Sequence, residues 1–214
     1  MYGKRCAAIV ACMGLLANGC ASYKGQPLSV ASSLRFRATA DQVTLQAEPL
    51  SGTQVEAAFD TRPGEIQVLF VRALFQNAGE MPYRIERKRI RLLTNQGIAL
   101  TPVSPFRVAS KMRLTHDALA DGSIFLFGVL SYPSFHSADE ASDAMLKDLT
   151  GKTFPEQVEL APHTTLGGML YFELPSYITS RDSVRIDAVL QPGSGAEPLV
   201  LQVPLVAETK EGVR

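Results

Sequence analysis

Histidine and cysteine, the residues best suited to metal binding and nucleophilic chemistry, are scarce in this sequence. The chain has three of each among its 214 residues. His116, His136 and His163 are far apart, and none has a cysteine or a second histidine at the short spacing that zinc ligands show. We therefore expect the histidines to lie in solvent-exposed turns, and we expect neither a bound metal nor a cofactor.

Motifs for phosphate binding and for nucleophilic catalysis are matched only in part. Gly151-Lys152-Thr153 has the ending of a P-loop, but Leu146 stands where the first glycine is required. Gly193 directly precedes Ser194, whereas a nucleophile elbow needs its glycine two residues before the serine. We therefore predict that the protein is not an enzyme. An envelope hydrolase is an alternative only if a Ser/His/acid or metal site converges in the fold.

All three cysteines lie within the first twenty residues. Lys4 and Arg5 precede an apolar run over residues 6–17, and small residues follow before Cys20. A basic start, an apolar run of about 7–15 residues and a small-residue cleavage site are typical of a secretory signal peptide. Because a helix needs about 20 apolar residues to cross a bilayer, the sequence predicts a signal peptide over residues 1–19 rather than a transmembrane anchor.

Cys20 is the last cysteine of the chain, and Leu15, Leu16, Ala17 and Gly19 stand shortly before it. This stretch resembles the lipobox of bacterial lipoproteins. The resemblance implies that the Cys20 thiol receives a diacylglycerol and that the chain is cut just before it. The alanine that follows is similar to a signal for the outer membrane, where the protein would face the periplasm. A plain signal peptide followed by an incidental cysteine is the alternative.

Residues 20–41 are small and polar, with little periodicity. We expect them to form a lipidated N-terminus and a flexible tether, which would hold the folded part roughly 25 Å from its membrane anchor. The membrane, reached through lipidated Cys20, is thus the first expected partner.

Charge excludes one class of partner. The whole chain has 21 basic and 21 acidic residues, and the first 19 residues include two cations and no acid, so the rest has a net charge of −2. Nucleic-acid binding requires a strong basic field. We therefore expect no nucleic-acid partner.

Alternation of apolar and polar residues dominates residues 42–208, which we expect to form one domain. Roughly seven short segments with turns about 8–12 residues apart are typical of a β-sandwich. The expected strands are residues 42–48, 65–77, 83–93, 98–103, 166–175, 183–190 and 198–206. The segment 65–77 is apolar on both faces, which predicts a central strand covered from both sides. We expect residues 209–214 to form a disordered tail.

Three sequence features resemble the immunoglobulin-like domains of exported bacterial proteins, many of them lipoproteins of unknown function. They are the strand ending Asn77-Ala78-Gly79, the restart at Pro82-Tyr83, and the segment 160–175 with its Gly168, Leu170, Phe172 and Pro175. The resemblance implies a mainly β, immunoglobulin-like antiparallel sandwich, and it brings no catalytic residues.

Residues 103–156 interrupt the strand pattern and predict a helical and apolar insert. Ser104 precedes a proline, a pair that suits the first positions of a helix. Ser137 and Glu140 match a capping box. We therefore expect the main helix to begin at Ala138 and to end at the next glycine.

Five cations within eight residues form a first candidate surface. They are Arg84, Arg87, Lys88, Arg89 and Arg91. One interpretation is contact with anionic lipid head groups, worth about 1 kcal/mol per basic residue near the membrane. The other is a charged strand that prevents edge-to-edge pairing. Strand alternation favours the second, because it would divide the cations between two faces.

The apolar segment 123–135 is a second candidate surface. Its candidate contact residues are Ile124, Phe125, Phe127, Leu130 and Phe135. Burial in the core is the first interpretation, because exposed apolar patches are uncommon. Contact with lipid or a partner protein is the second.

These observations predict a non-enzymatic lipoprotein of the cell envelope whose β-sandwich serves as a binding or assembly module, with an envelope protein as its expected partner. The alternative is a membrane-apposed accessory subunit that uses residues 124–135 to contact lipid or a partner protein.

Overall fold

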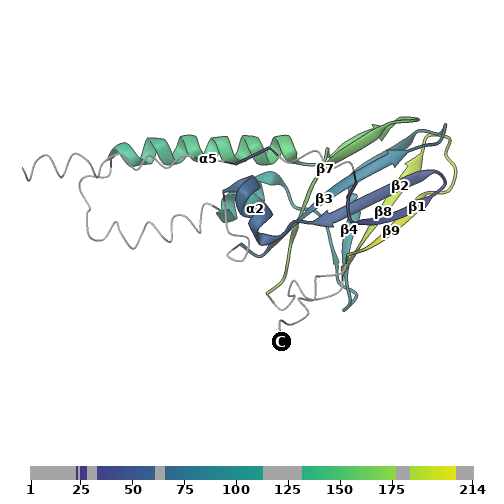
Figure 1. Cartoon of the computed structure of the whole chain (residues 1–214), viewed down its shortest axis with the longest axis horizontal. Helices are drawn as coiled ribbons and strands as arrows, with labels where there is room; N and C mark the ends of the chain where they lie inside the picture. Colours follow the sequence, from purple (N-terminus) through teal and green to yellow (C-terminus); the bar gives the residue numbers. More distant parts are fainter. Residues whose placement is uncertain are drawn as a thin grey trace, which may run out of the picture.

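Two antiparallel sheets packed face to face form the body of the molecule (Figure 1). The computed structural model describes residues 23, 25–27, 33–60, 66–112, 132–176 and 184–205, with the backbone alone for 132–141. Sheet A has the order β1 (Phe36–Ala40), β2 (Val43–Pro49), β3 (Val68–Asn77), β7 (Thr165–Glu173). Sheet B has the order β5 (Ala99–Leu100), β4 (Tyr83–Thr94), β8 (Val184–Pro192), β9 (Leu199–Leu205), and β6 (Gln157–Leu160) also pairs with β4. The expected fold class, a mainly β, immunoglobulin-like sandwich with a helical insertion, is confirmed.

The main core lies between the two sheets. Strands β2 and β9 bury every second residue, as the alternation in the sequence predicts. Val43 and Leu45 on β2 and Leu201 and Val203 on β9 are all at most 1 % exposed. Burial of such side chains is worth about 1.5–3 kcal/mol each, and this burial holds the sheets together without a disulfide among the described residues.

β3 is covered from both sides, as its apolar pattern predicts. Val71 and Phe75 point into the core between the sheets. Val68 and Phe70 point the other way, into a second core that sheet A shares with helices. The prediction of a central strand is therefore confirmed.

The helices cover one end of the outer face of sheet A (Figure 1). They are α2 (Gly52–Phe59), a helix over residues 105–112, and α5 (Tyr132–Lys152). Phe59 of α2 lies 5.0 Å from Phe70 and 6.2 Å from Tyr171, measured between ring centroids. Aromatic packing thus joins α2 to β3 and β7. α2 has its own capping box, formed by Ser51 and Gln54, and this helix was not among the expected elements.

The N-terminal segment is more ordered than the expected flexible tether over residues 20–41. β1 occupies Phe36–Ala40 and pairs along its whole length with β2. Leu34 is buried, and its backbone N–H donates to Gln46 Oε1 at 2.8 Å. This part of the prediction was wrong: Phe36, Ala38 and Ala40 alternate with polar residues and pack against the main core, a period-two signal confined to five residues.

The expected start of the main helix at Ala138 was also wrong, because α5 begins at Tyr132 and Ser137 lies inside it. Pro133 is the second helical residue, where its missing N–H has no intrahelical partner to lose. This proline, rather than the Ser137–Glu140 pair, is the start signal that the chain uses. The helix at Ser104 begins as expected, and Ser104 Oγ accepts from the Arg107 N–H at 3.3 Å.

Several predictions fall on residues that the structure does not describe. They are the signal peptide 1–19, Cys20, the tail 209–214, and most of the apolar segment, including Ile124, Phe125, Phe127 and Leu130. Phe135 belongs to α5, but its side chain is outside the description. Among the described helices, none combines the length and the apolar character that a membrane span requires.

Candidate functional site

The basic segment of β4 is interrupted by a bulge. Ile85 pairs with Leu190 and Ile90 pairs with Ala188 of β8. Four residues of β4 therefore lie opposite one residue of β8. Because a bulge breaks the alternation of a strand, the expected division of the cations between two faces does not apply here.

Three of the cations surround one carboxylate. Arg84 Nε, Lys88 Nζ and Arg89 Nε lie 3.4, 3.3 and 3.4 Å from the oxygens of Glu86. The Glu86 side chain is only 11 % exposed, whereas Lys88 is 79 % exposed. Hydrogen bonding from Lys88 lowers the pKa of the Glu86 carboxyl below its ordinary value; burial acts in the opposite direction, and Arg89 and Arg84 add to the lowering. Glu86 thus stays ionised and fixes the three cations beside one another.

The outward side of sheet B extends this cluster. Arg91 is the register partner of Asp187 on β8, and Arg185 Nε lies 3.0 Å from Asp187 Oδ1. Glu159 on β6 pairs with Arg84. We call this surface the basic face; its cations are Arg84, Lys88, Arg89, Arg91 and Arg185, and its acids are Glu86, Asp187 and Glu159.

The structure brings together four of the five cations that the sequence singled out. Arg87 is the exception: its Nη1 donates to the Phe154 carbonyl at 3.1 Å, and its backbone N–H donates to the Glu156 carbonyl at 2.9 Å. Arg87 therefore has a structural role. Arg185 was missed because it is distant in sequence, although the alternation of β8 indicates that it points outward.

β4 is not an edge strand along its whole length, because it pairs with β8 on one side and with β6 at residues 83–86 and β5 at residues 92–93 on the other. Among the described residues, no strand pairs with residues 88–91 on that second side. The interpretation that the charges of β4 prevent edge pairing therefore applies to this stretch alone and stays a prediction.

A hollow of about 450 Å³ lies at the tip of the sandwich, where three turns meet. Its lining includes Asp41 of the β1–β2 turn, Glu80 of the β3–β4 turn and Glu197 of the β8–β9 turn. His163 Nε2 lies 3.0 Å from Glu80 Oε1 and is exposed in a turn, as expected for a turn histidine. The described residues contain no group of three or more His, Cys, Asp or Glu that could hold a metal ion. No sequence pattern predicts this hollow, since its residues come from separate turns.

The partial motifs have structural roles. Lys152 Nζ contacts Asp148 Oδ2 at 2.5 Å and donates to the carbonyls of Gln26 and Ala58, each at 2.8 Å. No donor of Lys152 is left for a phosphate. Ser194 lies in the β8–β9 turn, where the N–H of Gly195 donates to the Pro192 carbonyl, so the hairpin interpretation is confirmed. His116 and the side chain of His136 are outside the described residues.

Comparison with known proteins shows weak structural similarity alone. No family model matches the chain, and no curated protein matches it. A solved structure of the yjhA protein from Bacillus subtilis is similar over 73 % of this chain and 78 % of that one, with 10 % sequence identity and a TM-score of 0.36. A likeness of this size carries no argument about function.

Proposed function

We propose that this protein is a non-enzymatic lipoprotein of the cell envelope, anchored through Cys20, whose sandwich binds an acidic surface of an envelope protein through the basic face. The observation that carries the binding role is the clustering of Arg84, Lys88 and Arg89 on Glu86. Like charges repel one another and would otherwise lie apart. The bulge instead holds them close together on the surface, where a partner can contact them.

The mixed charge of the basic face favours a protein partner over a lipid surface. Its five cations alternate with three carboxylates at fixed positions, and Glu86 and Asp187 are largely buried between their partners. Attraction to anionic lipid grows with the number of unneutralised cations near the membrane. A fixed pattern of both signs instead matches a complementary pattern on another protein, which provides specificity.

Anchoring is tested at Cys20. We expect Cys20→Ser to abolish the incorporation of a labelled fatty acid and to move the protein from the membrane fraction to the soluble fraction, because no other cysteine follows in the chain. Metabolic labelling with fractionation measures both effects. Equal labelling of variant and wild type would contradict a lipid at Cys20.

Binding is tested by reversing charge on the basic face. We expect Lys88→Glu/Arg91→Glu to weaken binding to the partner about tenfold or more, since each reversed charge costs on the order of 1 kcal/mol at an exposed site. The partner is first captured from detergent-solubilised envelopes, and its affinity is then measured in purified form at several salt concentrations.

Arg37→Glu/Lys147→Glu is the matched control, because both residues are exposed and lie outside the basic face. Equal losses in the two double variants would contradict a specific role of the basic face. Anionic vesicles provide the other comparison: binding to vesicles that depends on Lys88 and Arg91, without a protein partner, would assign the face to lipid instead.

A further inference from the structure

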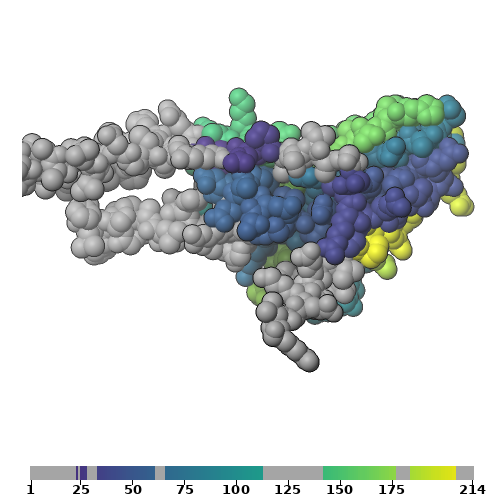
Figure 2. All heavy atoms as spheres, in the orientation of Figure 1, coloured from purple at the N-terminus to yellow at the C-terminus, as the bar shows by residue number. Residues whose placement is uncertain are grey.

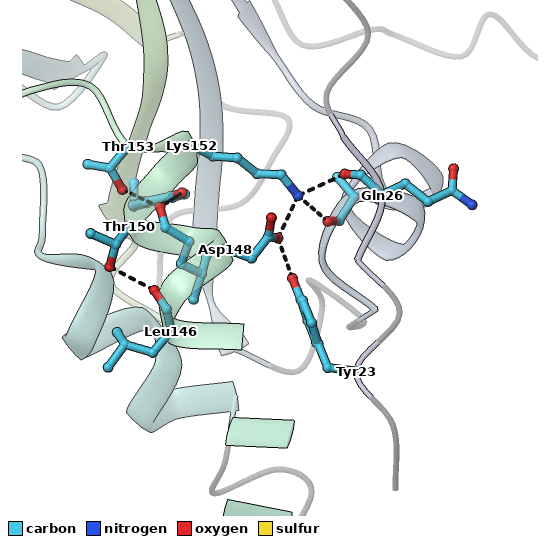
Figure 3. Close-up of polar contacts among 10 residues, drawn as sticks. Tyr23, Gln26, Leu146, Asp148, Thr150, Lys152 and Thr153 are labelled. Carbon is cyan, nitrogen blue, oxygen red and sulfur yellow. Dashed lines mark hydrogen bonds and ion pairs between the residues drawn. The ribbon is translucent and has the colours of Figure 1, made fainter. Parts of the chain in front are cut away.

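A short N-terminal segment lies on the helices that cover sheet A. Tyr23 Oη donates to Asp148 Oδ2 of α5 at 2.6 Å (Figure 3). The Gln26 N–H donates to the Ala57 carbonyl of α2 at 3.2 Å. The Tyr23 ring packs against the second core. Figure 2 shows this segment, in purple, lying against α5 and α2.

Lys152 links the N-terminal segment to α2 and α5. Its ammonium joins Asp148, the Gln26 carbonyl and the Ala58 carbonyl, and it lies 4.7 Å from the Phe59 ring centroid (Figure 3). The Lys152 side chain is only 10 % exposed. A buried charge is costly unless it is paired and hydrogen-bonded. If the segment moved away, the Lys152 ammonium would lose the Gln26 carbonyl as a partner, and this cost favours the bound position.

Gly25 lets the Tyr23 ring reach this position. A Cβ atom at residue 25 would collide with the Tyr23 phenol. Burial and the Asp148 carboxylate also raise the pKa of Tyr23 above its ordinary value, so the phenol remains a neutral donor throughout the physiological pH range. The sequence of the segment therefore suits docking rather than free movement.

The docked residue lies three positions after the proposed lipid site. Three residues of fully extended chain span about 10 Å, compared with the roughly 25 Å of a flexible 20-residue tether. We infer that the helical layer formed by α2 and the C-terminal part of α5 faces the membrane at close range, with a lipid surface as its partner. This inference rests on the proposed lipidation of Cys20.

The same arrangement directs the basic face away from the anchoring membrane. The helices pack on the outer side of sheet A, and the basic face is the outer side of sheet B. The lipid anchor and the basic face thus lie on opposite sides of the sandwich. One membrane contact and one protein contact can be made at the same time.

Energy transfer from single labelled positions to a headgroup-labelled lipid tests this orientation. The lipidated full chain is reconstituted in neutral vesicles, with the dye on Glu56→Cys of α2 or on Ala196→Cys at the sandwich tip, both exposed positions. We expect severalfold more efficient transfer from the Glu56→Cys position than from the Ala196→Cys position. The alkylated Cys20 does not react with the dye, so each label is unique.

Two further variants test the cause. A flexible insert of about 12 Gly/Ser residues after Ala21 adds roughly 20 Å of reach and should lower the transfer from Glu56→Cys; the same residues appended after Arg214 should leave it unchanged. Tyr23→Ala should also lower the transfer from the Glu56→Cys position, because it removes the hydrogen bond that holds the N-terminal segment on α5.

The outcomes separate this inference from the proposed function. Equal transfer from the two positions in a chain that still incorporates fatty acid would overturn the fixed orientation and leave the lipid anchor intact. Unchanged transfer in the insert and Tyr23→Ala variants would show that the bound N-terminal segment does not set the distance between the helical layer and the membrane. This result would also overturn the inference. Failure to incorporate fatty acid would refute the anchor, and the orientation with it.

Discussion

Replacing Gly168 with alanine is expected to lower the free energy of unfolding by about 3 kcal/mol, the cost of forcing extra volume into a site that cannot relax. A Cβ atom at residue 168 would lie 2.6 Å from Phe154 Cα and 2.7 Å from Phe154 N. The chain at Phe154 cannot move aside, because its N–H donates to the Met169 carbonyl at 2.9 Å and its carbonyl accepts from Arg87. The Phe154 ring is also buried in the main core, 5.3 Å from the Phe75 ring centroid.

Urea denaturation followed by circular dichroism measures this effect. Gly151→Ala is the matched control, because a Cβ atom there meets nothing within 4 Å. Because Gly151 lies in the last turn of α5, the Gly151→Ala variant should be as stable as wild type or more stable by up to about 1 kcal/mol. Equal stability of Gly168→Ala and wild type would show that the contact between β7 and residue 154 is looser than the structure indicates.

The Asn77→Ala variant is expected to lose about 3 kcal/mol, because it leaves several buried polar groups without partners. Asn77 is 1 % exposed. Its Nδ2 donates to the Met81 carbonyl at 2.7 Å and to the Ala161 carbonyl at 3.2 Å, and its Oδ1 accepts from the Gly79 N–H at 3.0 Å. One side chain therefore ties the β3–β4 turn, which connects the two sheets, to the turn that follows β6.

The neighbouring Gln76→Ala is the control, because Gln76 is exposed on the same strand and its loss should change stability by no more than about 0.5 kcal/mol. Asn77→Asp keeps the shape but replaces the donor with a carboxylate that faces carbonyl oxygens. It should be more stable at acidic than at neutral pH, since only the protonated carboxyl can donate. If the Asn77→Asp variant is as stable as wild type at every pH, the Nδ2 donor does not have this stabilising role.

Local pattern predicted the strands that bury one face. The segments expected at residues 42–48, 83–93 and 198–206 each overlap a strand of the structure. The apolar residues of these segments pack one face of each strand against the core, and in β4 the bulge interrupts the alternation. β1 and β6 also alternate, but they are only five and four residues long, so their pairing with β2 and β4 was needed to identify them as strands.

The basic face also depends on pairing between segments, which one segment alone does not reveal. Five basic residues close in sequence were visible at once, yet their arrangement depended on a bulge in the pairing of β4 with β8. That bulge sends Arg87 inward to Phe154 and leaves the other four cations facing outward beside Arg185. Register is a property of two strands together, so no reading of β4 alone could have separated these roles.

The sequence by itself determined the fold class, the two-sided burial of β3 and the lack of any complete catalytic motif. These follow from residue type and spacing within single segments. Tertiary structure decided which residues meet: Tyr23 with Asp148, Gln26 with Lys152, Arg84 and Arg89 with Glu86, and Gly168 with Phe154. Such contacts join segments up to 126 positions apart, and they form because burial and hydrogen bonding reward proximity in space, which sequence spacing does not record.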